Sequence, residues 1–448
     1  MNSLVFYKTG IMLLDKTCNL TLIVQCLRST PMQIERPGYI NELSIRKHNG
    51  MIKVVTGIRR CGKSYLLLKL FHNELLKSGV KDDHILEIAL DDFDNIPMRK
   101  PEALLSWLKS QLTDSLQYYL ILDEVQLLDH FVDVLNSCLH IDNLDVYVTG
   151  SNSRFLSTDV ITEFRGRGDE IHVFPLSFSE FMSGCGLPQD RALKDYLQYG
   201  GLPYVLSCQT PKQKMDYLDH VRKEVYLRDV AERNRIQHAP ELEELLHFYA
   251  SSIGALSSLR KLSDTFKSVK NIQLSIGTIG SYSNYLAEAF IIQRAKRYDI
   301  KGKRYIDSPS KVYFEDLGIR NACLDFRQTE PNHLMENLIY NELRARGFLV
   351  DVGAMTVREK NEDGKLQQKQ LEIDFIANQG DSRYYIQSVY QIPDDSKRDQ
   401  EYRPLLKIDD SFRKVVITYN DVPSYTNDYG ILTIGLPDFL LNPQSLNL

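Results

Sequence analysis

Apolar and polar positions along the first half of the chain follow the order expected for an α/β domain. Short apolar runs of strand length are separated by longer segments with leucines at helical spacing. The predicted strands span residues 52–55, 84–90, 118–122, 145–149 and 170–174. The predicted helices span residues 65–71, 101–116 and 131–140. Strands that alternate with helices in this way favour a parallel sheet.

The second half of the chain begins with helical patterns and then returns to strands. The predicted helices of the middle part span residues 189–209, 211–235, 241–253, 259–266 and 278–289. Two β segments follow at residues 290–298 and 304–314. The last part is predicted to contain a helix at 332–347 and strands at 348–352, 371–377 and 384–390. We therefore expect a second α/β domain behind a helical middle.

The end of the middle part has the order of a winged-helix domain, which is helix, turn, helix and β-wing. The second helix would start at Thr278 and expose Ser281, Tyr282 and Asn284, and the wing would offer Lys301, Lys303 and Arg304. These side chains suit phosphate contacts from a DNA duplex. The alternative is a winged helix that only packs against other domains.

The sequence G-x-x-x-x-G-K-S at Gly57–Ser64 lies between the first predicted strand and a predicted helix. In this context it is a P-loop, or Walker A motif, whose glycines let backbone N–H groups surround a phosphate. The positive end of the helix dipole favours the same anion. Lys63 can reach the β- and γ-phosphates of ATP, and the Ser64 hydroxyl can bind Mg²⁺. The predicted ATP-binding residues are Gly57, Ile58, Arg59, Arg60, Cys61, Gly62, Lys63, Ser64 and Tyr65.

The apolar strand at residues 118–122 ends in two carboxylates, Asp123 and Glu124. A Walker B element has this pattern, because the strand carries an aspartate to the sheet edge where it can hold Mg²⁺. Glu124 is then placed to orient and deprotonate the attacking water. We predict that Ser64 and Asp123 bind the metal and that Glu124 is catalytic. The alternative is a strand followed by a helix-capping acid.

Polar residues also end the next strand and precede the one after it. If the strand at 145–149 lies between the other two, it presents Ser151 or Asn152 to the γ-phosphate, and we predict Asn152 as the sensor. Either Arg165 or Arg167 could neutralise phosphate charge, in its own chain or in a neighbouring copy. The alternatives are an ordinary polar turn and a surface ion pair.

Length, charge and cysteine usage narrow the class of protein. The 448 residues are enough for two to four domains. The net charge of -5 gives no global signature of nucleic-acid binding, so any basic patch must be local. The seven cysteines are scattered without a C-x-x-C pair, which argues against a zinc site or a disulfide framework and fits a reducing compartment. No apolar run approaches transmembrane length, so we expect a cytoplasmic protein without a membrane partner.

The first 31 residues differ from the rest. Residues 20–27 are a short apolar run, but Asp15 and Lys16 precede it and no small-residue cleavage site follows, so we reject a signal peptide. Met32 opens an amphipathic lead-in to the first strand. We interpret Met32 as the natural start and residues 1–31 as a poorly ordered extension.

The order of these motifs resembles the AAA-type P-loop ATPases of bacteria and archaea that carry a C-terminal domain of unknown function. The glycine loop and the acidic strand end are shared by many ATPases, whereas Phe174–Phe181 and Tyr199–Pro203 are far more specific to this family. The resemblance covers residue 32 to the C-terminus. The matching segments are Val55–Ser64, Leu122–Gln126, Thr149–Asn152, Gly166–Arg167, Phe174–Phe181, Tyr199–Pro203, Arg297–Lys303 and Asp316–Arg320.

This resemblance implies ATP binding and hydrolysis, and it implies a parallel sheet with strand order 5-1-4-3-2. It also implies a helical lid behind the sheet. We expect an ATPase core at residues 32–183, the lid at 184–240, the winged-helix domain at 241–325 and an α/β domain at 326–448.

The last domain resembles the PD-(D/E)XK nuclease fold, with Glu336 on a helix and Asp374 on a strand. Its final motif has decayed, because Gln387 stands where a carboxylate is expected and Val389 where the lysine is. Glu336, Asp374 and Gln387 could still hold an ion as a remnant site. The missing lysine removes a stabiliser of transition-state charge, so we expect an inactive remnant that is structural or binds DNA.

Three functions remain open at this point. The first is a Mg²⁺-dependent ATPase whose nucleotide state moves the downstream domains, on DNA or elsewhere. The second is a nucleotide-gated DNA-binding regulator with little turnover, and the third is an ATP-dependent DNA nuclease. The oligomeric state is also open, because the arginines could act within one chain or between copies.

Overall fold

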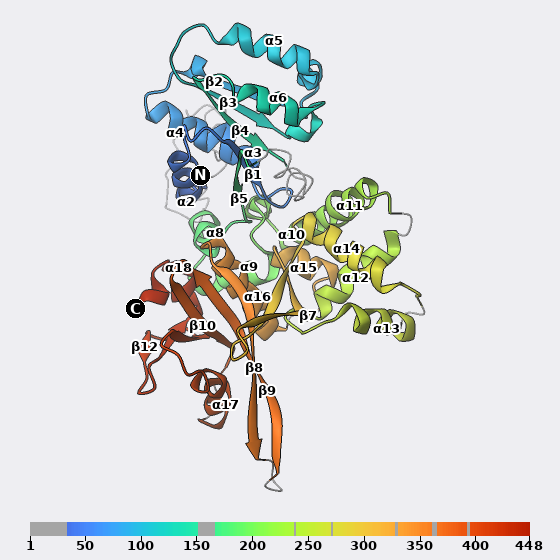
Figure 1. Cartoon of the computed structure of the whole chain (residues 1–448), viewed down its shortest axis with the longest axis vertical. Helices are drawn as coiled ribbons and strands as arrows, with labels where there is room; N and C mark the ends of the chain where they lie inside the picture. Colours follow the sequence, from blue (N-terminus) through green and yellow to red (C-terminus); the bar gives the residue numbers. More distant parts are fainter. Residues whose placement is uncertain are drawn as a thin grey trace, which may run out of the picture. The chain divides into compact units, whose positions relative to one another are not determined.

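In the computed structural model, the strands of the first half form one five-stranded parallel sheet (Figure 1). The strands are β1 (Ile52–Thr56), β2 (Ile85–Ala89), β3 (Tyr118–Asp123), β4 (Leu144–Thr149) and β5 (Gly168–His172). Their order across the sheet is β2-β3-β4-β1-β5. Counted from the other edge this is 5-1-4-3-2, so the expected strand order is confirmed.

Burial explains why these segments form a central sheet. Every residue of β1, β3 and β4 is buried, as expected for parallel strands that are covered on both faces. The helix after the P-loop is continuous, with α3 (Lys63–Tyr65), the π-helical turn η1 (Leu66–Phe71) and α4 (His72–Lys77). The other helices of this part are α2 (Pro37–Ile45), α5 (Pro101–Gln111) and α6 (Phe131–Cys138).

The structure describes residues 34–150, 166–236, 239–269, 272–327, 330–360, 365–391 and 395–448. The predicted N-terminal extension lies outside the described residues, and Glu35–Leu448 form one compact unit. Within the described ranges, no helix has both the length and the apolar character needed to cross a membrane.

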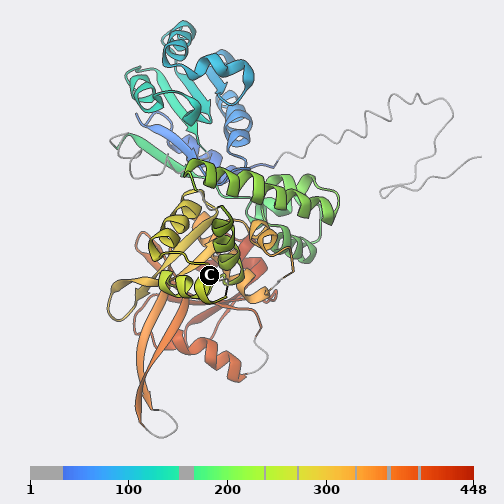
Figure 2. The same ribbon diagram turned by 90° about the vertical axis from the view of Figure 1, so that its right-hand side faces the viewer.

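Helices make up the middle of the chain. A long continuous helix, α10 (Pro211–His220), η7 (Val221–Leu227) and α11 (Arg228–Arg233), lies between the first sheet and the C-terminal strands (Figure 2). The other helices are α8 (Phe178–Cys185), α9 (Gln189–Tyr199), α12 (Ala239–Ser251), α13 (Leu259–Val269), α14 (Ile276–Glu288) and α15 (Leu317–Cys323). Short 3-10 helices lie at Asp82–His84, Phe93–Arg99, Val125–Leu127, Pro203–Ser207 and Ser445–Asn447.

The C-terminal part is built on an eight-stranded mixed sheet with the order β12-β13-β11-β10-β9-β8-β6-β7. Its two longest strands, β8 and β9, extend together as a hairpin beyond the rest of the sheet (Figure 1). The strands are β6 (Ile292–Asp299), β7 (Arg304–Phe314), β8 (Leu349–Lys360), β9 (Leu366–Gln379), β10 (Ser382–Val389), β11 (Arg413–Thr418), β12 (Tyr425–Thr426) and β13 (Ile431–Gly435). The helices are α16 (Pro331–Ala345), α17 (Asp395–Leu406) and α18 (Leu436–Leu441).

The predicted wing differs from a free β-hairpin. Strand β6 pairs in parallel with β8, with Arg297 opposite Val352, so the β6–β7 hairpin is the edge of the C-terminal sheet. The expected boundary at residue 325 therefore falls inside one hydrogen-bonded sheet. On α14, Ser281 and Asn284 are exposed as expected, but Tyr282 is buried with 7% of its surface exposed. The expectation that Tyr282 faces solvent was wrong, because Tyr282 packs on the inner side of its helix.

Two of the segments that carry the family resemblance, Tyr199–Pro203 and Asp316–Arg320, contact one another where α9 ends and α15 begins. Asp316 at the start of α15 accepts hydrogen bonds from the backbone N–H groups of Gly201 (2.8 Å) and Ile319 (2.9 Å). A Cβ on Gly318 would lie 2.1 Å from the carbonyl oxygen of Tyr199, so only glycine fits there. These motifs therefore have a packing role that explains their residue types.

Candidate active site

The P-loop turns tightly at the end of β1. Gly57 has a φ of +136°, and a Cβ there would lie 2.1 Å from the carbonyl oxygen of Val173. Gly62, with a φ of +102°, caps the following helix. The Lys63 ammonium donates to the carbonyl oxygens of Gly57 (2.8 Å) and Ile58 (3.1 Å). The lysine side chain therefore lies inside the loop, where a phosphate chain would be bound.

The acidic pair lies at the end of β3, which β4 separates from β1: Asp123 is the last residue of the strand and Glu124 follows it. The hydroxyl of Thr149, the last residue of β4, donates to the Asp123 carboxylate and accepts the N–H of Glu124 at 2.9 Å. Burial raises the pKa of Asp123, and hydrogen bonds from Thr149 and Ser64 partly offset this. Ser64 of the P-loop therefore lies within hydrogen-bonding reach of Asp123 of β3, and the sequence predicts these two residues as ligands of one metal ion.

Glu124 is held in an unusual backbone conformation. Its φ of +53° lies in the left-handed region, which costs free energy for any residue except glycine. Its carboxylate accepts a hydrogen bond from the side-chain amide of Gln126. The turn thus fixes the direction of the predicted general base beside Asp123.

This donor set fits ATP with Mg²⁺. Mg²⁺ in such sites is held by one or two protein oxygens together with phosphate oxygens and water. The Ser64 hydroxyl and the Asp123 carboxylate supply two oxygens, and Lys63 supplies a positive charge for the phosphates. The loop glycines leave room for backbone N–H groups to approach the anion.

The long helix of the middle part reaches the P-loop through an ion-pair network. Asp229 binds Arg59 of the loop (3.0 Å) and Arg233 of the same helix (2.8 Å). Burial lowers the pKa of Arg233, and the charges of Asp229 and Glu124 act against that shift. Arg233 therefore lies within electrostatic reach of the predicted base. Sequence reasoning missed Asp229 and Arg233, because charged residues on a helix surface are usually solvated.

The remaining predicted catalytic residues divide into two groups. Ser151, Asn152 and Arg165 lie outside the described residues. Arg167 is described, and its carbonyl oxygen accepts the N–H of Ile52 at 2.8 Å. It therefore lies beside the start of β1, whereas the P-loop follows the end of β1. This position argues against a role of Arg167 in the nucleotide site of its own chain. The predicted role in the site of a neighbouring copy remains a prediction.

The three residues of the predicted remnant site come together in the C-terminal sheet, but around a lysine. The Lys311 ammonium on β7 lies 2.8 Å from Glu336, 2.8 Å from Glu372 and 3.7 Å from Asp374. Gln387 follows Ile386, which pairs with Phe375, so Gln387 lies beside Asp374. Its side-chain oxygen is buried without a hydrogen-bond partner in the described part of the chain.

The electrostatics of this cluster do not fit a divalent metal. Burial raises the pKa of Asp374 to about 7, with a further contribution from Glu336, while Lys311 acts to lower it. Burial alone would lower the pKa of Lys311, but Glu336, Asp374 and Glu372 outweigh it and keep the lysine charged. No group of three or more His, Cys, Asp or Glu in the described ranges is arranged to hold a metal ion. The ammonium already supplies the positive charge that a metal would bring.

Lys311, Glu372 and Tyr313, whose hydroxyl donates to Glu336 at 2.7 Å, were not predicted. Glu372 lies two residues before Asp374 on β9, so strand alternation could have placed both on one face. Lys311 gave no such signal, since it lies on the hairpin that the sequence assigns to another domain.

Comparison with known proteins gives matches over most of the chain. A family model for an AAA domain matches residues 49–182, and a model for a domain of unknown function (DUF8612) matches residues 190–330. An uncharacterized protein of Haemophilus influenzae is 31% identical over 414 residues, which is 91% of this chain and 98% of that protein. An uncharacterized protein of Methanocaldococcus jannaschii is 26% identical over 402 residues, which is 85% of each chain.

Solved structures resemble the chain only weakly. The Aeropyrum pernix ORC1 protein in complex with DNA matches 66% of this chain and 94% of its own, at 13% identity and a TM-score of 0.27. A DNA replication initiation factor matches 55% of this chain and 81% of its own, at 15% identity and a TM-score of 0.25. Scores this low transfer no property to the chain. The extent of the sequence match does decide the family: this chain belongs to the protein family of the uncharacterized Haemophilus influenzae protein, and it carries an AAA-type P-loop domain at residues 49–182.

Proposed function

We propose that this protein is an AAA-type ATPase that hydrolyses ATP with Mg²⁺ and uses the cycle to rearrange its downstream domains. The observation that carries this proposal is the contact between Ser64 of the P-loop and Asp123 of β3, with Glu124 as the next residue. A structural role alone would not require a hydroxyl, a lysine and two consecutive acids at one sheet edge.

The chain's own residues divide the work of hydrolysis. Lys63 exchanges the carbonyl oxygens of Gly57 and Ile58 for the β- and γ-phosphates, so it is available without any movement of the backbone. Glu124 orients a water molecule and accepts its proton. Mg²⁺, when bound at Ser64 and Asp123, neutralises charge on the phosphates. Thr149 keeps Asp123 and Glu124 in a fixed relation during the reaction.

The ion pairs of Asp229 connect the P-loop to the long helix of the middle part, so they can transmit a change at the nucleotide site. Arg59 belongs to the P-loop and Arg233 to the long helix, and Asp229 binds both. Phosphates at the loop compete with Asp229 for these arginines, because an anion with several oxygens is the stronger partner. The nucleotide state thereby changes what holds the long helix against the loop.

The test is ATP turnover by the purified full chain with Mg²⁺. Glu124→Gln should still bind ATP in calorimetry but turn over at least about 100-fold more slowly. Lys63→Ala should lose ATP binding. Glu102→Gln, which changes an exposed acid on α5, serves as the matched control and should keep the wild-type rate. If Glu124→Gln turned over ATP at the wild-type rate, Glu124 would not be the general base.

The alternative is a nucleotide-gated DNA-binding regulator with little turnover. The exposed side chains of Lys301, Lys303 and Arg304 at the β6–β7 turn favour it, since such cations suit phosphate contacts. The wild-type protein would then bind ATP but release phosphate no faster than Glu124→Gln. A role of Arg167 between copies requires that copies assemble. Measuring the mass of the protein in solution with and without ATP·Mg²⁺ tests for this assembly. We do not propose nuclease activity, because Lys311 lies among the carboxylates of the remnant site.

A further inference from the structure

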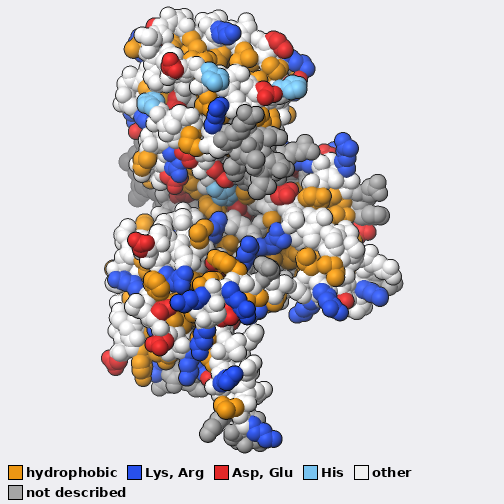
Figure 3. Space-filling model, viewed as in Figure 1, with side chains coloured by type: hydrophobic (Ala, Val, Ile, Leu, Met, Phe, Trp, Pro, Cys, Tyr) orange, Lys and Arg blue, Asp and Glu red, His pale blue; other side chains and the backbone are white. Residues whose placement is uncertain are grey.

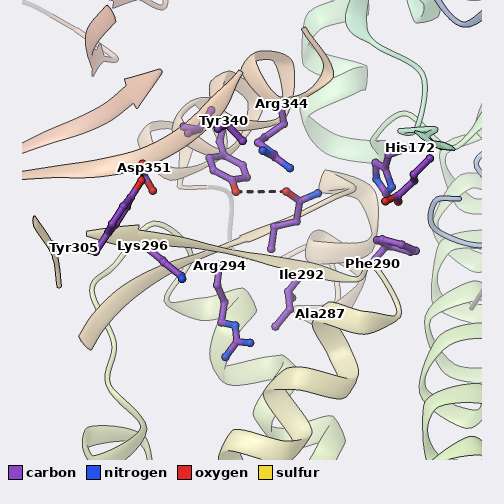
Figure 4. A pocket seen from close by; sticks show the side chains of 14 residues that line it. His172, Ala287, Phe290, Ile292, Arg294, Lys296, Tyr305, Tyr340, Arg344 and Asp351 are labelled. Carbon is purple, nitrogen blue, oxygen red and sulfur yellow. Dashed lines mark hydrogen bonds between the residues drawn. The ribbon is translucent and has the colours of Figure 1, made fainter. Parts of the chain in front are cut away.

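A pocket of about 780 Å³ lies where β6, β8, α14 and α16 approach β5 at the edge of the P-loop sheet. Figure 4 shows its two ends. The Arg344 guanidinium lies between Tyr340 and His172, and Asp351 and Tyr305 lie together at the far end. The pocket has no part in the proposed hydrolysis, so its composition calls for a separate explanation.

Cations dominate one end of this pocket. Arg294 and Lys296 of β6 are exposed, and both line the pocket. Arg344 enters from the last turn of α16, and its buried Nε has no acceptor among the described residues. The Asp351 carboxylate interacts electrostatically with Lys296, Arg383 and Arg344. Lysines and arginines gather over this part of the C-terminal sheet on the surface seen in Figure 3.

The pocket also contains carboxylates that limit its positive charge. Glu170 lines the end near β5, where it accepts a hydrogen bond from the Thr56 hydroxyl at 2.8 Å. Glu288 lies close to Arg294 at the end of α14. The positive excess is therefore local, around Lys296, Arg344 and Arg383.

An exposed aromatic ring lies at the Asp351 end of the pocket, within electrostatic reach of Arg383. Tyr305 has 57% of its surface exposed, and its hydroxyl donates to Asp351 at 3.1 Å. Its ring packs edge-on against Tyr298 with centroids 5.3 Å apart, and Arg383 lies over the Tyr298 ring. A fixed ring next to cations is how proteins bind single-stranded nucleic acid, because the bases of a single strand are free to stack on side chains.

Hydrogen bonds run from the pocket to the P-loop strand. The Tyr340 hydroxyl contacts Gln293 (3.4 Å), and Gln293 donates to Glu315 (2.8 Å). Glu315 lies 3.2 Å from Nε2 of His172, and Nδ1 of His172 lies 3.2 Å from the Thr56 hydroxyl. Thr56 immediately precedes Gly57 of the P-loop.

We propose that this pocket binds a segment of single-stranded nucleic acid, with phosphates at Lys296 and Arg344 and a base on Tyr305. A duplex fits less well, because its bases are stacked inside and cannot reach the ring. An acidic peptide would satisfy the cations but leave the ring without a partner. The binding step is independent of ATP hydrolysis, whereas any effect of the strand on the P-loop rests on the proposed function.

The experiment is fluorescence anisotropy of a labelled oligothymidylate with the full chain at several salt concentrations. Lys296→Ala should weaken binding several-fold and reduce the slope of log K against log salt by about 0.7. Tyr305→Ala should weaken binding about tenfold with the slope unchanged, because it removes stacking and no charge. Lys267→Ala, which changes an exposed lysine on α13 outside the pocket, should bind as the wild type does.

Each other outcome overturns the proposal. The protein could fail to bind the oligothymidylate at low salt, Lys296→Ala could bind it as tightly as the wild type, or a duplex could bind more tightly than the single strand. Polyglutamate could also bind as tightly as the oligothymidylate, with Tyr305→Ala having no effect on either. Arg344→Lys keeps the positive charge at this position. It therefore shows whether a loss of binding on changing Arg344 comes from the lost charge or from a loss of folding. Two measurements separate the proposals: Glu124→Gln should bind the oligothymidylate as the wild type does, whereas wild-type protein that binds it but does not turn over ATP contradicts the proposed ATPase alone.

Discussion

The Lys311 ammonium lies 2.8 Å from the Glu336 carboxylate, although the two residues belong to a strand and a helix that the sequence assigns to different domains. Only 4% of the lysine side chain is exposed. The same ammonium is 2.8 Å from Glu372, so one cation balances a group of acids. The C-terminal sheet therefore obtains a positive charge from within the chain.

Replacing this lysine by methionine should destabilise the protein. Lys311→Met keeps most of the side-chain volume but leaves buried carboxylates without a counter-charge, which costs about 3 kcal/mol in the free energy of unfolding. Urea denaturation of the full chain measures this loss. Lys369→Met, which changes an exposed lysine on β9, is the matched control and should be within about 0.5 kcal/mol of the wild type. Equal stability of the two variants would show that the acids do not need the ammonium.

Arg233 should affect turnover more than ATP binding. Its guanidinium is held by Asp229 and acts electrostatically on Glu124, so Arg233→Gln should slow hydrolysis by about tenfold or more. A coupled phosphate-release assay measures the rate. Arg228→Gln lies on the same helix but pairs with Glu224 and Glu232 on the surface, and it should keep the wild-type rate. If Arg233→Gln and Arg228→Gln slow hydrolysis equally, the cause is a general disturbance of the helix and not the loss of a charge near Glu124.

Gly318→Ala should loosen the junction between Tyr199–Pro203 and Asp316–Arg320. The added methyl group would lie 2.1 Å from the Tyr199 carbonyl oxygen, so the two segments must move apart. We expect a loss of about 2 kcal/mol in thermal or urea unfolding. Gly38→Ala is the control, because nothing lies within 4 Å of its added Cβ and alanine favours the helix there. A Gly318→Ala protein as stable as Gly38→Ala would contradict this packing.

Asp316 should make the free energy of unfolding depend on pH. Burial raises its pKa to about 6, against backbone N–H groups that act to lower it. The folded state therefore binds more protons than the unfolded state between the ordinary pKa of an aspartate, about 4, and about 6. The contribution of this group is fully present below about pH 4 and is lost as the pH rises through 6.

Asp316→Asn removes this titration. The stability of the wild type relative to Asp316→Asn should fall between about pH 4 and pH 6 and then stay level. Urea denaturation of both proteins across this range measures the difference. A constant difference would show that Asp316 is charged in the folded protein throughout the range.

The P-loop domain could be predicted from sequence because its chemistry follows its strands. Gly57, Lys63 and Ser64 follow one buried run and Asp123 follows another, and parallel strands bring their carboxyl ends to the same edge. The strand order came from the resemblance to AAA-type ATPases, and the observed order agrees. Contacts that join residues close in sequence, such as the capping of α8 by Ser177, also follow from local pattern.

Long-range partners could not be predicted in this way. The alternation of side chains along β7 indicates which residues share a face with Lys311, but it does not show which sheet the strand joins. Pairing of β6 with β8 decides that question, and it depends on β7, α15 and α16, which lie between them in the sequence. Asp229 was missed for the same reason, because its partner Arg59 lies far away in the sequence. Tyr282 was assigned to the wrong side of its helix because a half-polar helix has more than one plausible apolar face.

The pairing of β6 with β8 also bears on how proteins of this kind exchange parts during evolution. A recombination point at residue 326 would separate β8 from the hairpin that completes its sheet and would remove Lys311 from the acids it neutralises. The smallest segment that could move intact to another ATPase starts ahead of Ile292. A transplanted C-terminal half would therefore need the β6–β7 hairpin to keep its sheet and its ion pairs.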